Sequence, residues 1–366
     1  MSKVLYVWKG AYPWDIRADK VCRAFSETGW DVYILARWID EKSETEVLTN
    51  NIKVIRTGYE VPHYRTYPVS VNPIWKKAIL KLVNEIKPDL IMPRDIMLAE
   101  LCGKVGRKYN IPVIMDMAEN YPAAMKGWKK YKRTFLSRLL VHKLNIPELV
   151  EKRAVKLMDG IITVCQEQNE RLKEVYDYDI NRMCVAHNTP ETDFFSKESL
   201  KDNINQTQNN TSSKNYPKKL IFGHHGYTSD EKSLVKFLFG FQQASLENKN
   251  IEFHIAGTGE SIEELRALAE KFSSRDRIKF YGEYSYEDLP EIINKWDIGV
   301  IPYQLNEFNN FTIHNKIFDF FAMGKPVFCS ETKPFMRLIK ETGAGINVNC
   351  EREFAIRDAI LKIYDM

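Results

Sequence analysis

A lysine and an aspartate at the start of a predicted short helix could together bind a phosphorylated sugar. The apolar spacing predicts this helix over 316–323. Its first turn presents N–H groups without helical partners, and His314, Asn315 and Lys316 surround that turn, which favours phosphate binding. Asp319 lies one turn further along the Lys316 face, where its carboxylate can accept hydrogen bonds from a sugar diol. The alternative is an Asp–Lys pair on a solvated helix face.

Two glycine-containing turns follow predicted strands in the same half of the chain. Gly226 lies in the segment GHHGYTSDEK together with Lys232, and Gly257 and Gly259 lie between a predicted strand and a predicted helix. A lone G-x-G is a weak signal, so a plain tight turn is the alternative, and Lys232 could be a solvated turn lysine. The loop after the first predicted strand lacks G-x-G-x-x-G, and the phosphate-binding G-x-x-x-x-G-K-[ST] is also absent.

The elements that position these residues alternate between strand and helix in both halves of the chain. This alternation predicts two α/β units with parallel sheets covered on both faces. Ligands of such open sheets lie beyond the carboxyl ends of the strands, so two units facing each other would form an interdomain cleft. The main predicted strands are 4–8, 31–35, 54–56, 90–92, 113–116, 160–164, 219–223, 251–257, 279–282, 298–302 and 326–329.

The domain organisation follows from length and from one change in composition. A chain of 366 residues predicts about two domains. The segment 196–218 is polar and Asn-rich, which is typical of a flexible linker. We therefore expect one domain over 1–195 and a second domain over 219–366, joined by this linker. The chain ends soon after a predicted helix, where we would expect one further closing helix.

Composition excludes several classes of protein. Apolar residues at 44% and charged residues at 28% are typical of a soluble globular protein. The first residues predict a strand rather than a secretory leader, and no apolar run approaches the roughly 18 residues of a membrane span. Six cysteines without a C-x-x-C pair predict neither a zinc site nor a disulfide framework, so we expect a cytoplasmic protein. A net charge of +4 is too small to argue for nucleic-acid binding.

One segment, 126–146, contains no acidic residue. Its cations are interleaved with aromatic and aliphatic residues, a pattern that favours attachment to an anionic membrane surface, with the protein peripheral on the inner face of the membrane. A solvated basic face over ordinary core residues and an electropositive funnel for an anionic acceptor are the alternatives. The cations that we assign to such a surface are Lys126, Lys129, Lys130, Lys132 and Arg133.

The segments DIGVIPY and NKIFDFFAMGKPV of the second half resemble the donor-site signature of the family-4 retaining glycosyltransferases, which have the GT-B fold of two Rossmann-like domains. The resemblance covers most of the chain, and it implies that 1–195 is the acceptor-side domain and 219–366 the donor-binding domain. Further blocks that resemble landmarks of the family are 87–89, 116–122, 187–190, 253–260, 278–283, 289–290 and 343–345.

The resemblance implies a role for each matching residue. Asp319 would hold the donor ribose hydroxyls, and Lys316 and Lys232 would face the donor diphosphate with Gly226. It also implies retention of the anomeric configuration, with the leaving phosphate helping to deprotonate the acceptor. Lysines at the leaving group would stabilise its charge without a metal ion. The residues expected around the donor, including its base, are Tyr227, Gly257, Gly259, Glu283, Tyr284, His314 and Asn315, and those expected near the diphosphate and acceptor are Trp14, Asp15, Arg17 and Glu119.

The chain also departs from the family pattern. Phe311 occupies the first acidic position of the E-x7-E motif, and Ala118 replaces a histidine that would contact the donor sugar. Trp14 and Asp15 stand in place of a glycine pair, and Tyr227 stands where an arginine is common. Donor binding is therefore expected, while these substitutions favour a catalytically silent subunit as the alternative.

Two possible metal motifs were weighed against this expectation. Asp177 and Asp179 form a D-x-D, the metal-binding signature of the other major glycosyltransferase fold. They follow a predicted helix in a polar sequence, which favours a surface turn. His224 and His225 lack further ligands at metal spacing, which favours a structural or phosphate-facing role.

The sequence thus predicts an enzyme that transfers a sugar from a nucleotide-diphosphate sugar, with UDP or GDP as the expected nucleotide and no other cofactor. The expected acceptor is a glycan or a lipid-linked saccharide in cell-surface or exopolysaccharide biosynthesis. A nucleotide-sugar epimerase or hydrolase on the same scaffold is the alternative among enzymes, and a silent nucleotide-sugar-binding subunit is the alternative outside them.

Overall fold

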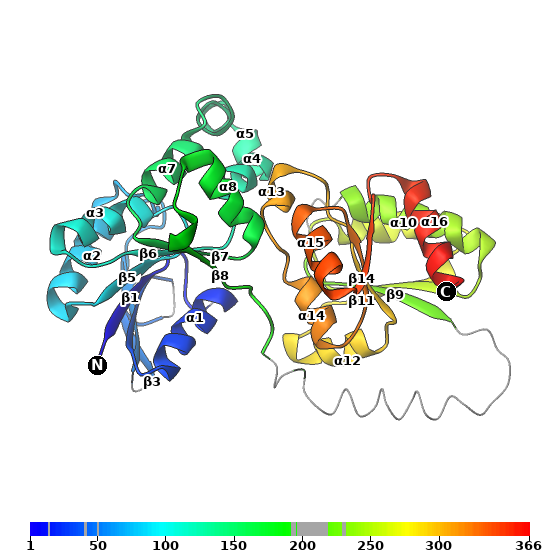
Figure 1. Cartoon of the computed structure of the whole chain (residues 1–366), viewed down its shortest axis with the longest axis horizontal. Helices are drawn as coiled ribbons and strands as arrows, with labels where there is room; N and C mark the ends of the chain where they lie inside the picture. Colours follow the sequence, from blue (N-terminus) through cyan, green and yellow to red (C-terminus); the bar gives the residue numbers. More distant parts are fainter. Residues whose placement is uncertain (14, 40–41, 50, 192–194, 196–218, 229–231) are drawn as a thin grey trace. The chain divides into compact units, whose positions relative to one another are not determined.

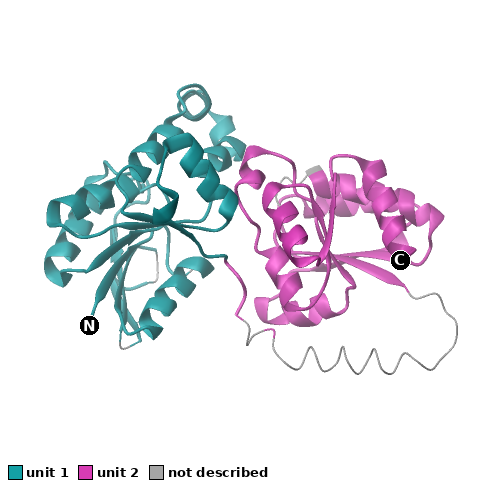
Figure 2. Cartoon of the chain, viewed as in Figure 1, with its two compact units in different colours: residues 1–187 teal, residues 188–366 magenta. Residues whose placement is uncertain are grey.

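The computed structural model of the chain describes residues 1–13, 15–39, 42–49, 51–191, 195, 219–228 and 232–366. These residues form two compact units, Met1–His187 (unit 1) and Asn188–Met366 (unit 2), coloured separately in Figure 2. The predicted linker 196–218 and the predicted site residue Trp14 lie outside the described residues.

Unit 1 is built on two sheets that adjoin each other. A five-stranded sheet has the order β3-β4-β2-β1-β5, and isolated bridges at Ile91–Val113 and Arg94–Asp116 connect it to a three-stranded sheet of order β6-β7-β8. The predicted parallel pairing is confirmed except at one edge, where β3 adds an antiparallel strand that the sequence did not predict. The strands are β1 (Lys3–Val7), β2 (Asp31–Arg37), β3 (Thr45–Thr49), β4 (Ile52–Thr57), β5 (Leu90–Pro93), β6 (Ile114–Met117), β7 (Gly160–Thr163) and β8 (Met183–Val185).

Helices cover both faces of the larger sheet of unit 1. The buried strand β1 alternates between two cores: Leu5 and Val7 pack with residues of α2 and α3, whereas Val4 and Tyr6 pack with residues of α1. The helical elements are α1 (Ile16–Glu27), α2 (Pro73–Ile86), α3 (Ala99–Tyr109), α4 (Tyr121–Gly127), α5 (Lys130–Arg133), α6 (Phe135–Arg138), the π-helical turn η1 (Leu139–Lys143), α7 (Ile146–Val155), α8 (Gln166–Tyr176) and the 3-10 turn η2 (Ile180–Arg182).

Unit 2 contains one six-stranded sheet, in which every pair of neighbouring strands is parallel, with the order β11-β10-β9-β12-β13-β14. Its core includes the rings of Phe222, Phe237, Phe253 and Phe328, and α10 packs against α16 beside it (Figure 1). The strands are β9 (Leu220–His225), β10 (Ile251–Ala256), β11 (Ile278–Gly282), β12 (Ile298–Ile301), β13 (Val327–Ser330) and β14 (Gly345–Val348).

The helices of unit 2 include one that the sequence did not predict. The expected long loop before residue 315 contains the short helix α13 (Glu307–Asn310). None of the helices in the described ranges has both the length and the apolar character that crossing a bilayer requires. The remaining helical elements are α10 (Lys232–Glu247), α11 (Ile262–Ala269), the 3-10 turns η3 (Arg275–Arg277) and η4 (Tyr286–Asp288), α12 (Leu289–Asn294), α14 (Lys316–Ala322), α15 (Lys333–Thr342) and α16 (Glu353–Tyr364).

Each unit has a point where the strand order reverses. In unit 1 the chain proceeds from β1 to one side of the sheet and from β5 to the other, and in unit 2 it does the same from β9 and β12. Loops that follow the two central strands diverge at such a point and leave space for a ligand. The fold therefore directs attention to the segments after β1 and β5 in unit 1 and after β9 and β12 in unit 2.

Candidate functional site

The turns after β9 and β10 pack backbone against backbone in unit 2. The amide of Gly226 donates to the carbonyl of Ala256 at 2.9 Å, and the amide of Thr228 donates to that of Thr258 at 2.8 Å. A Cβ on Gly257 would lie 2.1 Å from the Gly226 carbonyl oxygen, and one on Gly259 would lie 2.0 Å from that of Thr228. Both glycines also have positive φ, so only glycine fits this double turn.

Lys316, the first residue of α14, lies over this double turn. A Cβ on Gly226 would be 2.7 Å from Lys316 Cε and 3.5 Å from its Nζ. The ammonium donates a hydrogen bond of 3.1 Å to the Tyr303 hydroxyl. The structure thus brings together four predicted donor residues, because Lys316 places a cation beside the turns of Gly226, Gly257 and Gly259.

Asp319 lies one turn further along α14 and is only 6% exposed. Its Oδ1 accepts a hydrogen bond of 3.4 Å from the Tyr286 hydroxyl, and its Oδ2 lies 3.7 Å from His225 Nε2. His225 Nδ1 in turn lies 3.2 Å from the Tyr284 hydroxyl. The alternative of a solvated Asp–Lys helix face is therefore wrong for Asp319, which is buried in a row of hydrogen-bonding side chains.

The histidines of this site are uncharged at neutral pH. Burial lowers the pKa of His225 well below its ordinary value, and the charge of Lys316 lowers it further. Burial and the Lys316 charge also lower the pKa of His224 and of His314 to about 3. Burial and the Asp319 carboxylate raise the pKa of Tyr284, so its hydroxyl stays protonated. A carboxylate among neutral donors and acceptors can bind a diol, and an ammonium nearby can bind phosphate.

The remaining predicted donor residues are less closely engaged. Tyr227 is 60% exposed, and Glu283 and Asn315 are exposed beside the turns that carry them. His314 stacks on the Tyr303 ring with centroids 3.6 Å apart, and its Nε2 lies 2.8 Å from Asn309 Oδ1. This contact gives His314 a role in supporting the loop before α14. Lys232 is the first residue of α10, and its side chain lies outside the described part of the chain.

The two departures from the family pattern have definite surroundings. Phe311 ends α13, and Lys333 Nζ lies over its ring at 4.9 Å from the centroid. The position of an acidic residue is thus occupied by an aromatic ring that carries a cation on its face. Ala118 follows β6, and its amide donates to Asp95 Oδ1 at 3.1 Å.

In unit 1, a buried network of charges lies where β1, β5 and β6 end. Asp116 is fully buried and accepts hydrogen bonds from Arg17 Nε at 2.8 Å and from the Tyr6 hydroxyl at 2.8 Å. Arg94 NH1 lies 2.9 Å from Asp95 Oδ1. Lys9 Nζ lies 3.6 Å from Asp95 Oδ2 and also contacts the hydroxyl of Tyr121 in α4.

The predicted acceptor-side residues take different positions around this network. Arg17 lies in α1 and is 5% exposed. Its Nε and NH2 both lie beside Asp116, and its NH1 donates a hydrogen bond of 2.7 Å to the carbonyl oxygen of Ala186, so the whole guanidinium is bound within unit 1. Asp15 is the N-cap of α1 and lies 3.3 Å from Arg94 NH2. Glu119 is partly exposed at the rim, and burial raises its pKa to about 7, with Asp95 adding to the increase. Of these three side chains, Arg17 thus forms a buried ion pair inside unit 1.

Several site residues were missed from the sequence. Lys9, Arg94 and Asp95 lie just after the ends of predicted strands of unit 1, so strand ends were an available signal. His225, which ends β9, was predicted to be structural or phosphate-facing, and its contact with Asp319 was not predicted. Tyr286 had no such signal, because it reaches Asp319 from the separate 3-10 turn η4.

The basic segment of unit 1 forms α4 to η1 and exposes apolar side chains as well as cations. Lys126 is ion-paired with Glu148 of α7. Lys130 covers aromatic rings, and Lys129, Lys132 and Arg133 are exposed. The exposed apolar side chains in or just after this segment are Phe135 at 76%, Leu136 at 62%, Leu140 at 39%, Leu144 at 51%, Ile146 at 37% and Leu149 at 46%.

The D-x-D lies in a surface turn, as predicted. Asp177 is an exposed residue with a φ of 53° at the end of α8. Asp179 caps η2 by accepting a hydrogen bond of 2.9 Å from the amide of Asn181. Within the described ranges, no three His, Cys, Asp or Glu side chains are arranged to hold a metal ion.

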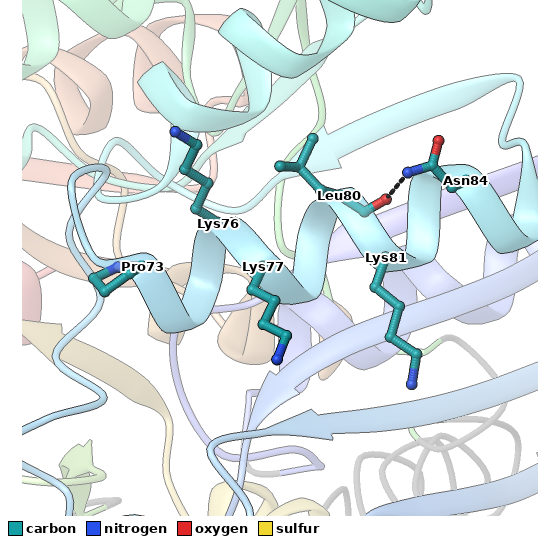
Figure 3. Close-up of a pocket in the computed structure, with 6 residues that line it drawn as sticks. All are labelled: Pro73, Lys76, Lys77, Leu80, Lys81 and Asn84. Atoms are coloured by element: carbon teal, nitrogen blue, oxygen red, sulfur yellow. Dashed lines mark hydrogen bonds between the residues drawn. The ribbon is translucent and has the colours of Figure 1, made fainter.

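A shallow surface depression runs along α2 (Figure 3). All the residues that line it come from this one helix, and Lys77 and Lys81 point to the opposite side of the helix from Lys76. Because its only charged groups are lysines on flexible stems, we assign it no function. Its lining residues are Pro73, Lys76, Lys77, Leu80, Lys81 and Asn84.

Comparison with known proteins covers nearly the whole chain. Residues 16–194 match the family model described as Glycosyltransferase Family 4, and residues 219–366 match the one described as Glycosyl transferases group 1. None of the curated proteins matches this chain in sequence.

Several solved structures are similar to the chain over its length. Sucrose-phosphate synthase from Thermosynechococcus elongatus has a TM-score of 0.69 and 14% identity, covering 100% of this chain and 90% of that one. Anabaena HepE in complex with UDP has a TM-score of 0.67 and 12% identity, with coverage of 100% and 90%. The lipopolysaccharide outer core galactosyltransferase WaaB has a TM-score of 0.68 and 11% identity, with coverage of 99% and 90%. At such identities the likeness is one of fold.

Proposed function

The chain belongs to the glycosyltransferases of family 4, which have the GT-B fold, and from this premise we propose that it transfers a sugar from a nucleotide-diphosphate sugar to a saccharide acceptor with retention of configuration. Unit 2 would bind the donor and unit 1 the acceptor. The observation that carries the proposal is the arrangement of Lys316 over the glycine turns with Asp319 buried one helical turn away.

Asp319 would accept hydrogen bonds from the ribose hydroxyls of the donor. Its carboxylate accepts a hydrogen bond from Tyr286 and lies close to the neutral His225, so it is held in place at the site. HepE, which shares the fold, has been solved with UDP and with UDP-glucose, which supports UDP as the first nucleotide to test.

Lys316 would stabilise the charge that develops on the leaving diphosphate. In the reaction, the bond between the anomeric carbon and the phosphate oxygen breaks and a bond to the acceptor oxygen forms on the same face. The acceptor proton would pass to the leaving phosphate. Positive charge placed at that phosphate is the main requirement, and a single lost contact of this kind typically costs about 3–4 kcal/mol of transition-state stabilisation. We propose that Lys316 and Lys232 meet it without a metal ion, so that activity persists in EDTA.

The acceptor would be a glycan or a lipid-linked saccharide of cell-surface or exopolysaccharide biosynthesis, and the enzyme would act at the inner face of the membrane. The exposed Phe135 and Leu136, next to the exposed cations Lys132 and Arg133, support contact with an anionic bilayer. Co-sedimentation with vesicles tests this: F135A/L136A should bind anionic vesicles less than the wild type. The control L48A removes an exposed leucine, 42% exposed, that lies outside this segment. Equal pelleting with neutral and anionic vesicles would refute membrane contact.

Titration calorimetry with UDP, GDP and ADP tests the donor site. D319A should lower the affinity for the nucleotide by about tenfold or more, since hydrogen bonds to a charged group contribute about 1.5–3 kcal/mol. D276A removes an exposed carboxylate, 77% exposed, of the same unit and should leave affinity unchanged. Nucleotide binding that is indifferent to D319A, or no binding at all, would refute the donor-site assignment.

A second candidate function is a catalytically silent nucleotide-sugar-binding subunit. Phe311 and Ala118 favour it, because each occupies a position where the family carries a group that contacts the donor. Release of free nucleotide from UDP- and GDP-sugars, measured with and without a panel of saccharide acceptors, separates the two functions. Tight nucleotide binding without any release would favour the silent subunit.

A further inference from the structure

Two aromatic rings of the basic segment lie side by side beneath a lysine. The centroids of Trp128, which follows α4, and Tyr131, in α5, are 5.9 Å apart and their planes differ by 23°. Lys130 Nζ lies over both rings, 4.5 Å from the first centroid and 4.9 Å from the second. We call this stacked pair of rings the aromatic platform, and the Lys130 ammonium lies within cation–π distance of both rings.

The aromatic platform continues towards the ends of the unit 1 strands. Trp128 packs edge-to-face with Tyr121 at 6.0 Å, and Lys9 Nζ lies 3.9 Å from the centroid of Tyr121. On its other side, the Tyr131 hydroxyl lies 3.3 Å from that of Tyr67, which is 46% exposed. A row of aromatic side chains thus runs from Lys9, just after β1, to the exposed loop before α2 that carries Tyr67.

The chemistry of this row suits a sugar ring with a negative charge. The face of an aromatic ring is electron-rich and meets the C–H face of a pyranose, while hydroxyls around that face can bond to Tyr67 and Tyr131. Lys130 is exposed, so its ammonium can leave the aromatic rings and pair with an anion at a small cost in free energy. The surroundings reinforce this preference, because the segment 126–146 has no acidic residue.

We propose that the aromatic platform binds a pyranose ring bearing a carboxylate or phosphate, and that this ring belongs to the acceptor. That the bound sugar is the acceptor rests on the proposed function, but the binding itself can be tested without any donor. The anion would pair with Lys130, the ring would stack on Trp128 and Tyr131, and the hydroxyl to be glycosylated would lie towards Lys9. The apolar tip at Phe135 and Leu136 is a separate feature and is not needed for this site.

The test measures saccharide binding to the full chain by saturation-transfer NMR titration. The paired probes are tetragalacturonate and its methyl ester, which share rings but differ in charge, and glucose 1-phosphate and glucose. We expect each anionic probe to bind about tenfold more tightly than its neutral partner, since charge-assisted contacts account for differences of this size. Tighter binding of either anionic probe supports the proposal and identifies the anion as carboxylate or phosphate.

Three variants separate this site from general basicity. K130M should abolish the preference for the anionic probes, whereas K108M, which removes a lysine lying 5.2 Å over the Tyr109 ring on α3, should preserve it. Y131L should weaken both members of a pair by about fivefold, because it removes the stacking surface. UDP affinity should stay unchanged in all three.

The outcomes that overturn the inference are distinct from failure of the donor site. Equal binding of charged and neutral probes, equal behaviour of K130M and K108M, or binding only to anionic phosphatidylglycerol vesicles would each overturn it. Loss of UDP binding in D319A with saccharide binding intact leaves this site standing. If UDP binds but neither anionic probe does, this inference is wrong and the donor assignment is unaffected.

Discussion

Replacing Gly226 by alanine should weaken nucleotide binding by displacing Lys316. The added Cβ would lie 2.7 Å from Lys316 Cε, closer than carbon atoms approach, and the residue has a φ of +101°. The atom that must move belongs to a flexible stem rather than to backbone, so we expect the ammonium to leave its position beside the double turn while the fold survives. Gly343 provides a matched control, because it has a φ of +67° in the same unit and no atom within 4 Å of an added Cβ.

G226A and G343A should differ in their effect on nucleotide affinity for a clear reason. Both force an alanine into a backbone conformation that costs about 1–3 kcal/mol of folding stability. Only G226A also removes a charged contact to a diphosphate, which contributes about 1.5–3 kcal/mol and hence roughly tenfold to a hundredfold in affinity. G257A should be the most destabilising, since its Cβ would meet the Gly226 carbonyl oxygen at 2.1 Å and backbone cannot move aside.

Thermal unfolding and calorimetric titration with UDP and GDP measure the two effects on the same samples. We expect G226A and G343A to melt at similar temperatures, below the wild type, with reduced nucleotide affinity only in G226A. Equal affinity in G226A and G343A would refute the placement of the diphosphate beside Lys316. If G257A melted with G343A, the close packing of the two turns would be refuted instead.

Three further predictions concern stability and pH. D116N should lower the free energy of unfolding in urea by about 3–5 kcal/mol, because it leaves the buried Arg17 without its carboxylate, while K104Q at an ion pair whose lysine is 63% exposed should change it by less than about 1 kcal/mol; similar losses would contradict this. E119Q should become more stable relative to the wild type as pH rises from 4.5 to above 7, by up to about 3 kcal/mol. The folded state raises the pKa of Glu119 to about 7, so over this range the carboxyl ionises more readily in the unfolded wild type, which lowers the wild type's free energy of unfolding. A constant difference between about pH 4.5 and 8 would contradict it. H225F should lose less stability than the wild type as pH falls from 6.5 to 5, by about 2 kcal/mol, because only the unfolded wild type binds a proton at His225 there; parallel urea profiles would contradict it.

The proximity of Lys316, Asp319 and the glycine turns in unit 2 could be predicted largely because these parts are local in the sequence. Lys316 and Asp319 share one helix face, and the glycine turns follow strands whose carboxyl ends meet at one edge of a parallel sheet. The partners of Asp319 could not be predicted in this way. His225 and Tyr286 reach it from other elements, and which side chains meet depends on packing that no spacing in the sequence encodes.

Unit 1 shows the opposite case. Its strands were predicted well, but the partner of Arg17 was not predicted, because Asp116 lies 99 residues further along the chain. Only the sheet order, which places β6 beside β5 and hence near β1, brings the two together. A buried arginine finds the carboxylate that compensates its desolvation, and this choice of partner is a property of the folded chain.

The electrostatics of the two units support the proposed division of donor and acceptor between them. In unit 1, cations and carboxyl groups at the strand ends pair with one another, and the raised pKa of Glu119 to about 7 shows that a further negative charge is unfavourable there. Such a network suits an uncharged part of a ligand, whose hydroxyls exchange hydrogen bonds with it. In unit 2, neutral histidines and tyrosines surround Asp319, and the Lys316 side chain lies beside glycine backbone. A ligand with a neutral diol at one end and a diphosphate at the other matches unit 2, and a sugar hydroxyl matches the strand ends of unit 1.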